Sequence, residues 1–183
     1  MKHLICFFII LSWSLPIFAQ GRFYDSQLTF SGTTFKPRDN DEILFSGLKF
    51  GYEKNTSTLA SIGAFLEFKL ANHEYGSGTP YVEKVEYSMF SLGGEYIFYL
   101  SPKRELFFGS EFLYCSLVSK LKSNGKIYSE TTEGFGIVPK MGGGVYTSEK
   151  AYLFLCFKYH LITFDEEDDL RGLGVEAGFS YEL

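Results

Sequence analysis

Two histidines follow the first twenty residues, and each has neighbours that could take part in proton transfer. His73 lies beside Glu74 and close to Ser77, whereas His160 lies two residues after Lys158. A histidine held by a serine or an acid can act as a general base. However, the partners of His73 are only neighbours along the chain, and His160 shares its predicted strand face with a cation. We therefore predict ordinary solvated or ion-paired histidines and assign no catalytic residue.

The densest charge cluster is the run of five acids at residues 165–169. Carboxylate oxygens are the ligands that divalent cations such as Ca²⁺ prefer, so the run could gather a cation. It lacks the spaced acids, central glycine and terminal glutamate of an EF-hand loop. A solvated loop explains the run without any ligand. No metal site is therefore assigned, and cation binding at this run stays open.

The glycine runs at residues 93–94 and 142–144 resemble phosphate loops only in composition. A phosphate loop needs a following helix whose N-terminus holds the phosphate, and no helix is predicted after either run. Glycine within a strand instead permits bends and leaves room for large neighbours such as Phe65 and Tyr87. No cofactor is expected.

Residues 1–19 have the pattern of a cleavable signal peptide. Lys2 and His3 precede an apolar run at residues 4–15, which is too short to cross a bilayer as a helix. Ala19 places a small residue at the predicted cleavage position. Residues 20–183 then form the predicted mature chain, which is one domain by length.

The mature chain is acidic and poor in cysteine. The whole sequence has 17 Lys and Arg against 22 Asp and Glu, and removal of Lys2 with the leader changes the net charge from −5 to −6. Such a chain is a poor binder of nucleic acid. Only Cys115 and Cys156 remain after the leader is removed, too few for a disulfide framework, and we predict two free thiols.

Period-two alternation recurs through the mature chain, whereas helical periodicity is scarce. It predicts eight strands, at residues 23–34, 42–53, 58–71, 83–100, 105–121, 127–146, 151–164 and 171–183. Short turns at residues 55–57, 101–103 and 147–149 alternate with longer polar loops at residues 36–41, 72–82, 122–126 and 165–169. Both termini therefore lie on the side of the short turns, which is the topology of a bacterial outer-membrane barrel.

The last predicted strand has one apolar and one polar face, since Val175 and Phe179 alternate with Glu176 and Ser180. The mature chain resembles the small eight-stranded outer-membrane barrels of the OmpA and OmpX type, most strongly in its ending, Gly-Phe-Ser-Tyr-Glu-Leu. The resemblance implies an all-β fold, an eight-stranded antiparallel up-and-down transmembrane β-barrel. It also implies that the barrel assembly machinery recognises this strand, although Leu183 stands where the family usually has an aromatic residue.

Seven charged residues on seven predicted strands share the inner face and lie at a similar height above the turns. They are Lys49, Glu67, Glu95, Glu111, Lys140, Lys158 and Glu176. An eight-stranded barrel is only wide enough inside for side chains, so these charges should link opposite walls and close the lumen. This layer is interpreted as structural. A proton relay or a narrow gated pore built from the same residues is the alternative.

The third to sixth predicted strands exceed the ~9–11 residues that cross a membrane, so their ends should stand above it. A protruding sheet with an exposed edge can bind a partner strand by main-chain pairing. We therefore expect a non-enzymatic structural or adhesive protein of the bacterial outer membrane, exported through the periplasm. Its expected partners are outer-membrane lipids, lipopolysaccharide, the assembly machinery and an extracellular protein ligand. Transport of small solutes and lipid modification by a barrel enzyme are the alternatives.

Overall fold

The computed structural model describes residues 26–40, 42–75, 83–101, 103–123, 126–165 and 169–183. Its strands are β1 (Ser26–Pro37), β2 (Phe45–Ser57), β3 (Ala60–Tyr75), β4 (Glu83–Tyr99), β5 (Leu106–Ser123), β6 (Lys126–Tyr146), β7 (Ala151–Phe164) and β8 (Asp169–Glu182). The signal peptide predicted for residues 1–19 lies outside the described residues. No helix in these residues is long and apolar enough to cross a membrane.

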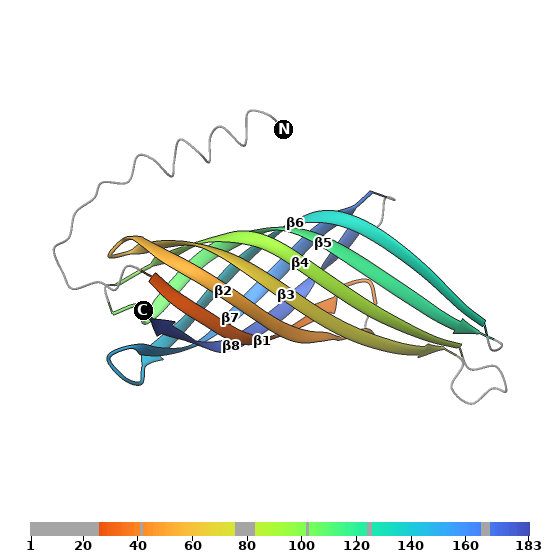
Figure 1. Ribbon diagram of the computed structural model, residues 1–183, viewed down its shortest axis with the longest axis horizontal. Coiled ribbons are helices and arrows are strands. Elements are labelled where there is room, and N and C mark those ends of the chain that lie inside the picture. The colour runs from red at the N-terminus through yellow and green to blue at the C-terminus, as the bar shows by residue number, and fades with distance from the viewer. Residues whose placement is uncertain (1–25, 41, 76–82, 102, 124–125, 166–168) are drawn as a thin grey trace.

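Each strand pairs antiparallel with the next one along the chain, and β1 pairs with β8 to close a barrel (Figure 1). The first and last described residues meet at one end, where the N–H of Leu183 donates to the carbonyl of Ser26 at 3.0 Å. We call this the turn end, because the β2–β3, β4–β5 and β6–β7 connections also lie there, and the opposite one the loop end. The predicted fold class, an eight-stranded antiparallel up-and-down barrel, is confirmed.

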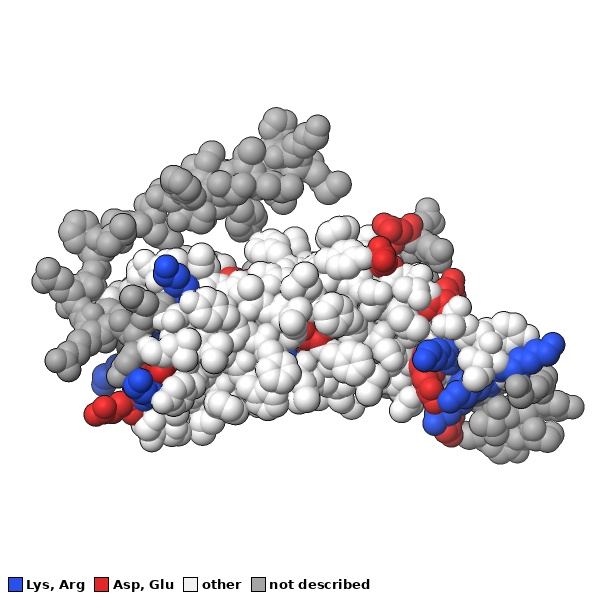
Figure 2. All heavy atoms as spheres, viewed as in Figure 1, with Lys and Arg blue, Asp and Glu red and all other residues white. Residues whose placement is uncertain are grey.

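Most exposed apolar side chains lie on the outer surface of the barrel. On β8, Leu173 and Phe179 are exposed, whereas Glu176 and Ser180 are buried inside the barrel. The two faces predicted for the last strand, β8, are therefore confirmed. Figure 2 shows that most charged residues gather at the two ends of the molecule, with a broad central band of mostly uncharged atoms between them.

Two apolar clusters fill the interior on either side of a charged region. Along β5, Phe107 belongs to the cluster nearer the turn end, Glu111 follows it, and Leu113 belongs to the cluster nearer the loop end. The charged region touches the loop-end cluster through Lys49, whose Nζ lies 4.2 Å from the ring centre of Phe65. Side chains of the two apolar clusters and of the charged region thus point into the barrel.

Several predicted boundaries are wrong, and two of them share one cause. Residues 55–57 were expected to form a turn, but they belong to β2, and Thr58 and Leu59 make the turn instead. Residues 72–75 were expected in a loop, but they extend β3. In both places main-chain pairing carries a strand past the local turn signal, because Asn55 still pairs with Ser61 and residues 71–75 still pair with β4.

Candidate functional site

Six charged side chains from six strands form one connected set of ion pairs inside the barrel. We call them the interior charge network: Lys49 (β2), Glu95 (β4), Glu111 (β5), Lys140 (β6), Lys158 (β7) and Glu176 (β8). Each occupies an inward position of its strand, and none is more than 7% exposed. Three ammonium groups face three carboxylates, so the buried charges balance, as burial requires.

Lys49 joins three of the other strands. Its Nζ lies 2.9 Å from Glu95 Oε2, 2.7 Å from Glu111 Oε1 and 3.8 Å from Glu176 Oε1. None of these strands, β4, β5 and β8, pairs with β2. The ion pairs of Lys49 therefore cross the lumen instead of running along the wall.

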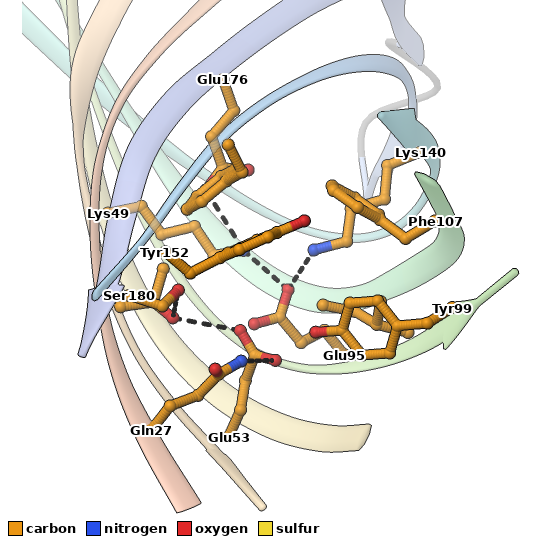
Figure 3. Close-up of a pocket in the computed structure, with 13 residues that line it drawn as sticks. Gln27, Lys49, Glu53, Glu95, Tyr99, Phe107, Lys140, Tyr152, Glu176 and Ser180 are labelled. Atoms are coloured by element: carbon orange, nitrogen blue, oxygen red, sulfur yellow. Dashed lines mark hydrogen bonds and ion pairs between the residues drawn. The ribbon is translucent and has the colours of Figure 1, made fainter. Parts of the chain in front are cut away.

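Lys158 and Lys140 complete the network. Lys158 Nζ lies 2.7 Å from Glu111 Oε1 and 2.5 Å from Glu176 Oε2. Lys140 contacts both Glu95 and Glu111, and Figure 3 shows its ammonium group pointing at Glu95. Every carboxylate of the network thus meets at least two lysines, so removal of any one member leaves others without full compensation.

Glu67, the seventh residue of the predicted layer, lies beside the network and has a different partner. Its Cα is opposite that of Lys49 in the β2–β3 ladder, but its ion pair is with Lys69 on its own strand, at 2.5 Å. Both side chains are buried. Sequence reasoning left Lys69 out of the layer because it lies two residues farther along β3, although alternation places it on the same face.

Uncharged side chains surround Glu53, which lies closer to the turn end than the interior charge network does, and they donate hydrogen bonds to it. Glu53 accepts hydrogen bonds from Gln27 Nε2 at 2.8 Å, Thr29 Oγ1 at 3.1 Å and Ser61 Oγ at 3.0 Å. Figure 3 shows Gln27 and Glu53 below the network. The cavity between Glu53 and the interior charge network has a volume of about 20 Å³, enough for one water molecule. Sequence reasoning missed Glu53, whose position near a strand end indicated a solvated side chain.

Arg104 closes the turn end of the interior. Its side chain is 3% exposed, with the guanidinium carbon 4.7 Å from the ring centre of Tyr99 and Nη1 3.6 Å from Glu182. Its carbonyl accepts a hydrogen bond from the Tyr152 hydroxyl at 2.6 Å. The φ of Arg104 is 58°, a strained value for a residue with a Cβ, so these contacts hold the turn inward against that strain. Sequence reasoning missed it, because a charged residue beside a turn usually faces water.

The two histidines lie in different surroundings from those expected. His73 is on β3 instead of in a loop, and its Nε2 lies 3.2 Å from Glu42 Oε2. His160 is fully buried, its ring centre is 4.2 Å from that of Phe35, and neither ring nitrogen has a hydrogen-bond partner among the described residues. The expectation of a solvated or ion-paired His160 is therefore wrong.

The acidic run at residues 165–169 lies partly outside the described residues, since residues 166–168 are not described. Within the described part of the chain, no group of three His, Cys, Asp or Glu side chains is arranged to hold a metal ion. Cys115 and Cys156 are both buried free thiols, as predicted.

A second candidate site is the sheet that rises at the loop end. β5 and β6 have 18 and 21 residues, against 12 in β1 and 14 in β7. The protruding sheet comprises residues 71–75, 83–87, 116–123 and 126–133, and Figure 1 shows it extending beyond the other strands. On it, Lys122 Nζ lies 2.7 Å from Glu86 Oε1, and this hydrogen bond lowers the pKa of the Glu86 carboxyl.

A closed eight-stranded barrel with apolar side chains outside and ion pairs inside is the architecture of small outer-membrane barrels. No protein-family model and no curated protein matches the sequence. Solved structures match the fold. The structure of Ail, the attachment invasion locus protein of Yersinia pestis, in complex with the heparin analogue sucrose octasulfate is 11% identical with a TM-score of 0.56. The match covers 85% of this chain and 95% of that one.

The N-terminal β-barrel domain of Pseudomonas aeruginosa OprF is also similar. It is 11% identical with a TM-score of 0.54, over 85% of this chain and 97% of that one. At such low identity the likeness concerns the fold alone. The chain has the fold of small eight-stranded outer-membrane barrels, and the resemblance inferred from its sequence is confirmed at that level.

Proposed function

We propose that the chain is a non-enzymatic barrel of the bacterial outer membrane that has a closed lumen and binds a partner at the cell surface. The observation that carries the proposal is the distribution of side chains, with ion pairs inside, an uncharged apolar belt outside and a protruding sheet at one end. Each of these three features supports one part of the proposed function.

The belt supports a membrane location. Every strand has outward side chains that are exposed and apolar, for example Leu28, Leu48, Leu66, Leu92, Phe112, Ile137, Leu155 and Val175. In water such a surface would favour aggregation, whereas lipid solvates it. The proposed partners of the belt are outer-membrane lipids and lipopolysaccharide. The route through the periplasm, with loss of residues 1–19 and recognition of β8 by the assembly machinery, is part of the same proposal.

The interior charge network supports a closed lumen. Its ion pairs cross between walls, and the cavity beside it has room for one water molecule rather than a file of them. Transport of solutes through the barrel would require these pairs to separate and leave charges unpaired in a narrow space, which is costly. The network is therefore proposed to be structural.

The histidines support a protein without catalytic activity. His160 is fully buried inside the barrel against Phe35, out of reach of a lipid outside the barrel. His73 is 7% exposed and faces inward from β3. Mass spectra of lipid A from cells with and without the protein check this part of the proposal, and a new lipid A species would contradict it.

The protruding sheet supports a role in binding at the cell surface. Ail, which has this fold, has been solved with a heparin analogue, and by analogy the loop end of this chain is the proposed place for an extracellular ligand. The open strand edges of the sheet suit a protein ligand that binds in an extended conformation.

Accessibility labelling of intact cells tests the location and the orientation together. Cysteine is introduced at Lys122, on the protruding sheet, or at Lys103, in a turn-end connection, and intact cells receive a membrane-impermeant maleimide. The buried Cys115 and Cys156 should stay unlabelled. The proposal requires labelling of the Lys122→Cys variant only. Labelling of Lys103→Cys alone would invert the orientation, and labelling of neither in intact cells would place the protein elsewhere.

A further inference from the structure

Residues 126–133 of β6 form an open strand edge. They pair with β5, whereas pairing with β7 begins only at Gly134, opposite Phe164. The N–H of Asp165 donates to the carbonyl of Glu133 at 3.2 Å, so odd-numbered residues of β6 direct their main-chain polar groups toward the β7 side. Ile127, Ser129 and Thr131 therefore present N–H and C=O groups to which no strand pairs within the described residues.

The edge lacks most of the devices that usually protect such strands. Proline, a bulge or a row of lysines would block pairing, but residues 126–133 contain no proline, and the β5–β6 register is unbroken. The segment has three charged residues, one lysine and two glutamates, which are of both signs. Ile127 is 66% and Tyr128 57% exposed, and both residue types favour strands. An added strand would satisfy the main chain and cover these side chains.

We infer that the strand added to this edge is residues 126–130 of a second copy of the chain, an inference that rests on the proposed surface location. When two identical strands pair antiparallel, residues that face each other must point to the same side, so the pairing centres on one residue. Centring on Tyr128 places Lys126 of each copy opposite Glu130 of the other. Ile127 then faces Ser129, and their main-chain groups are the ones directed outward.

Neighbouring registers lack this match. Centring on Ser129 places Lys126 opposite Thr132 and Glu130 opposite Tyr128, so neither charge faces its opposite. Centring on Glu130 places two carboxylates directly across from each other, which is destabilising. The register centred on Tyr128 is therefore favoured by charge complementarity.

The symmetry of this pairing determines where the second copy lies. A two-fold axis perpendicular to the sheet reverses every direction within the sheet plane, including the direction of the barrel axis. The partner is therefore upside down relative to the first copy, which places it in a facing membrane. Pairing within one membrane is excluded, because copies with the same orientation cannot bring tilted edge strands antiparallel. The contact joins two outer membranes, edge to edge at the loop end of each copy.

A two-colour aggregation assay tests the inference. Two cell populations that display the full chain, with short lipopolysaccharide so that the edge is uncovered, carry different fluorescent proteins and are mixed. Wild-type populations should form mixed-colour aggregates. Lys126→Glu cells and Glu130→Lys cells should each fail to aggregate alone, but should aggregate when mixed with each other, because both charge pairs are restored. Lys103→Glu, the same charge change at the turn end, should leave aggregation intact.

Ser129→Pro is a second probe that removes an edge N–H without disturbing pairing to β5. It should abolish aggregation while the protein remains folded on an unboiled gel. Failure of the charge-swapped populations to aggregate together, when wild-type cells do aggregate, would overturn the register. Absence of wild-type aggregates while Lys122→Cys is labelled from outside would overturn self-pairing but leave the proposed function standing. Absence of both would overturn both.

Discussion

Lys158 on β7 and Glu111 on β5 lie 2.7 Å apart inside the barrel, although β6 separates their strands. Glu111 is fully buried, and its other partners are Lys49 and Lys140. A contact of this kind ties strands that main-chain hydrogen bonds do not join. The stability of the barrel should therefore depend on side chains that no solvent reaches.

Replacement of one network member should strongly destabilise the barrel. Glu111→Ala removes a carboxylate that pairs with three lysines. Lys158→Ala removes an ammonium group that pairs with Glu111 and Glu176. Removal of one partner of a buried ion pair generally costs about 3–5 kcal/mol. The free energy of unfolding can be measured in urea from the difference in gel mobility between folded and unfolded protein, a readout that needs no tryptophan.

The control for this comparison is Glu86→Ala, which breaks the ion pair with Lys122 on the protruding sheet. That pair is exposed to solvent, so its loss should leave the urea midpoint unchanged. Equal midpoints for Glu111→Ala, Lys158→Ala and Glu86→Ala would show that the interior charges do not stabilise the barrel.

The Glu67–Lys69 pair should behave as a unit separate from the network. Lys69→Met leaves the buried Glu67 carboxylate without its cation and should lower the free energy of unfolding by about 3 kcal/mol. The double variant Glu67→Gln/Lys69→Met removes both charges and should recover most of that loss. The same urea titration gives the coupling energy. Additive losses in the double variant would mean that the two side chains do not compensate each other.

Gly93 and Gly94 provide a matched pair of glycines. A Cβ on Gly93 would lie 2.7 Å from Phe65 Cζ and 2.3 Å from the Phe112 carbonyl, so Gly93 leaves room for Phe65, as predicted from the sequence. A Cβ on Gly94 would meet nothing closer than the Gly63 carbonyl at 3.5 Å. Gly93→Ala should therefore lose about 1–3 kcal/mol through overpacking, while Gly94→Ala should be tolerated. A larger loss for Gly94→Ala would contradict this packing.

Cys115 and Cys156 should remain unreactive thiols in the folded protein. Both are fully buried, on β5 and β7, and neither is in a disulfide. A small maleimide should modify neither before boiling and both after it. A peptide map without reductant that shows the two joined would require a different strand register.

The fold could be predicted from the sequence because the alternation of side chains is local. On β8, the alternation from Leu173 to Tyr181 shows which residues face outward, and the turn signals give the number of strands. The sequence also indicated, for the same reason, that the six members of the network lie on the inner face. Height along a strand follows from counting residues from the turn end, and all six lie at similar heights.

The partners within the site could not be predicted, because they depend on the stagger between strands and on side-chain reach across the lumen. Lys49 has Glu67 opposite it in the ladder, yet its ion pairs are with Glu95 and Glu111 on strands farther around the barrel. Arg104 depends on a turn conformation with positive φ that nothing in the local sequence indicates, since glycine would be the expected residue there.

The most direct test of the closed lumen is electrical recording from the purified wild-type protein in a planar lipid bilayer. Insertion of the folded protein is verified first by its mobility on an unboiled gel. If the interior charge network closes the barrel, the bilayer should carry no steady ionic current after insertion. Steady single-channel currents from the wild-type protein would contradict the closed lumen and favour transport of small solutes instead.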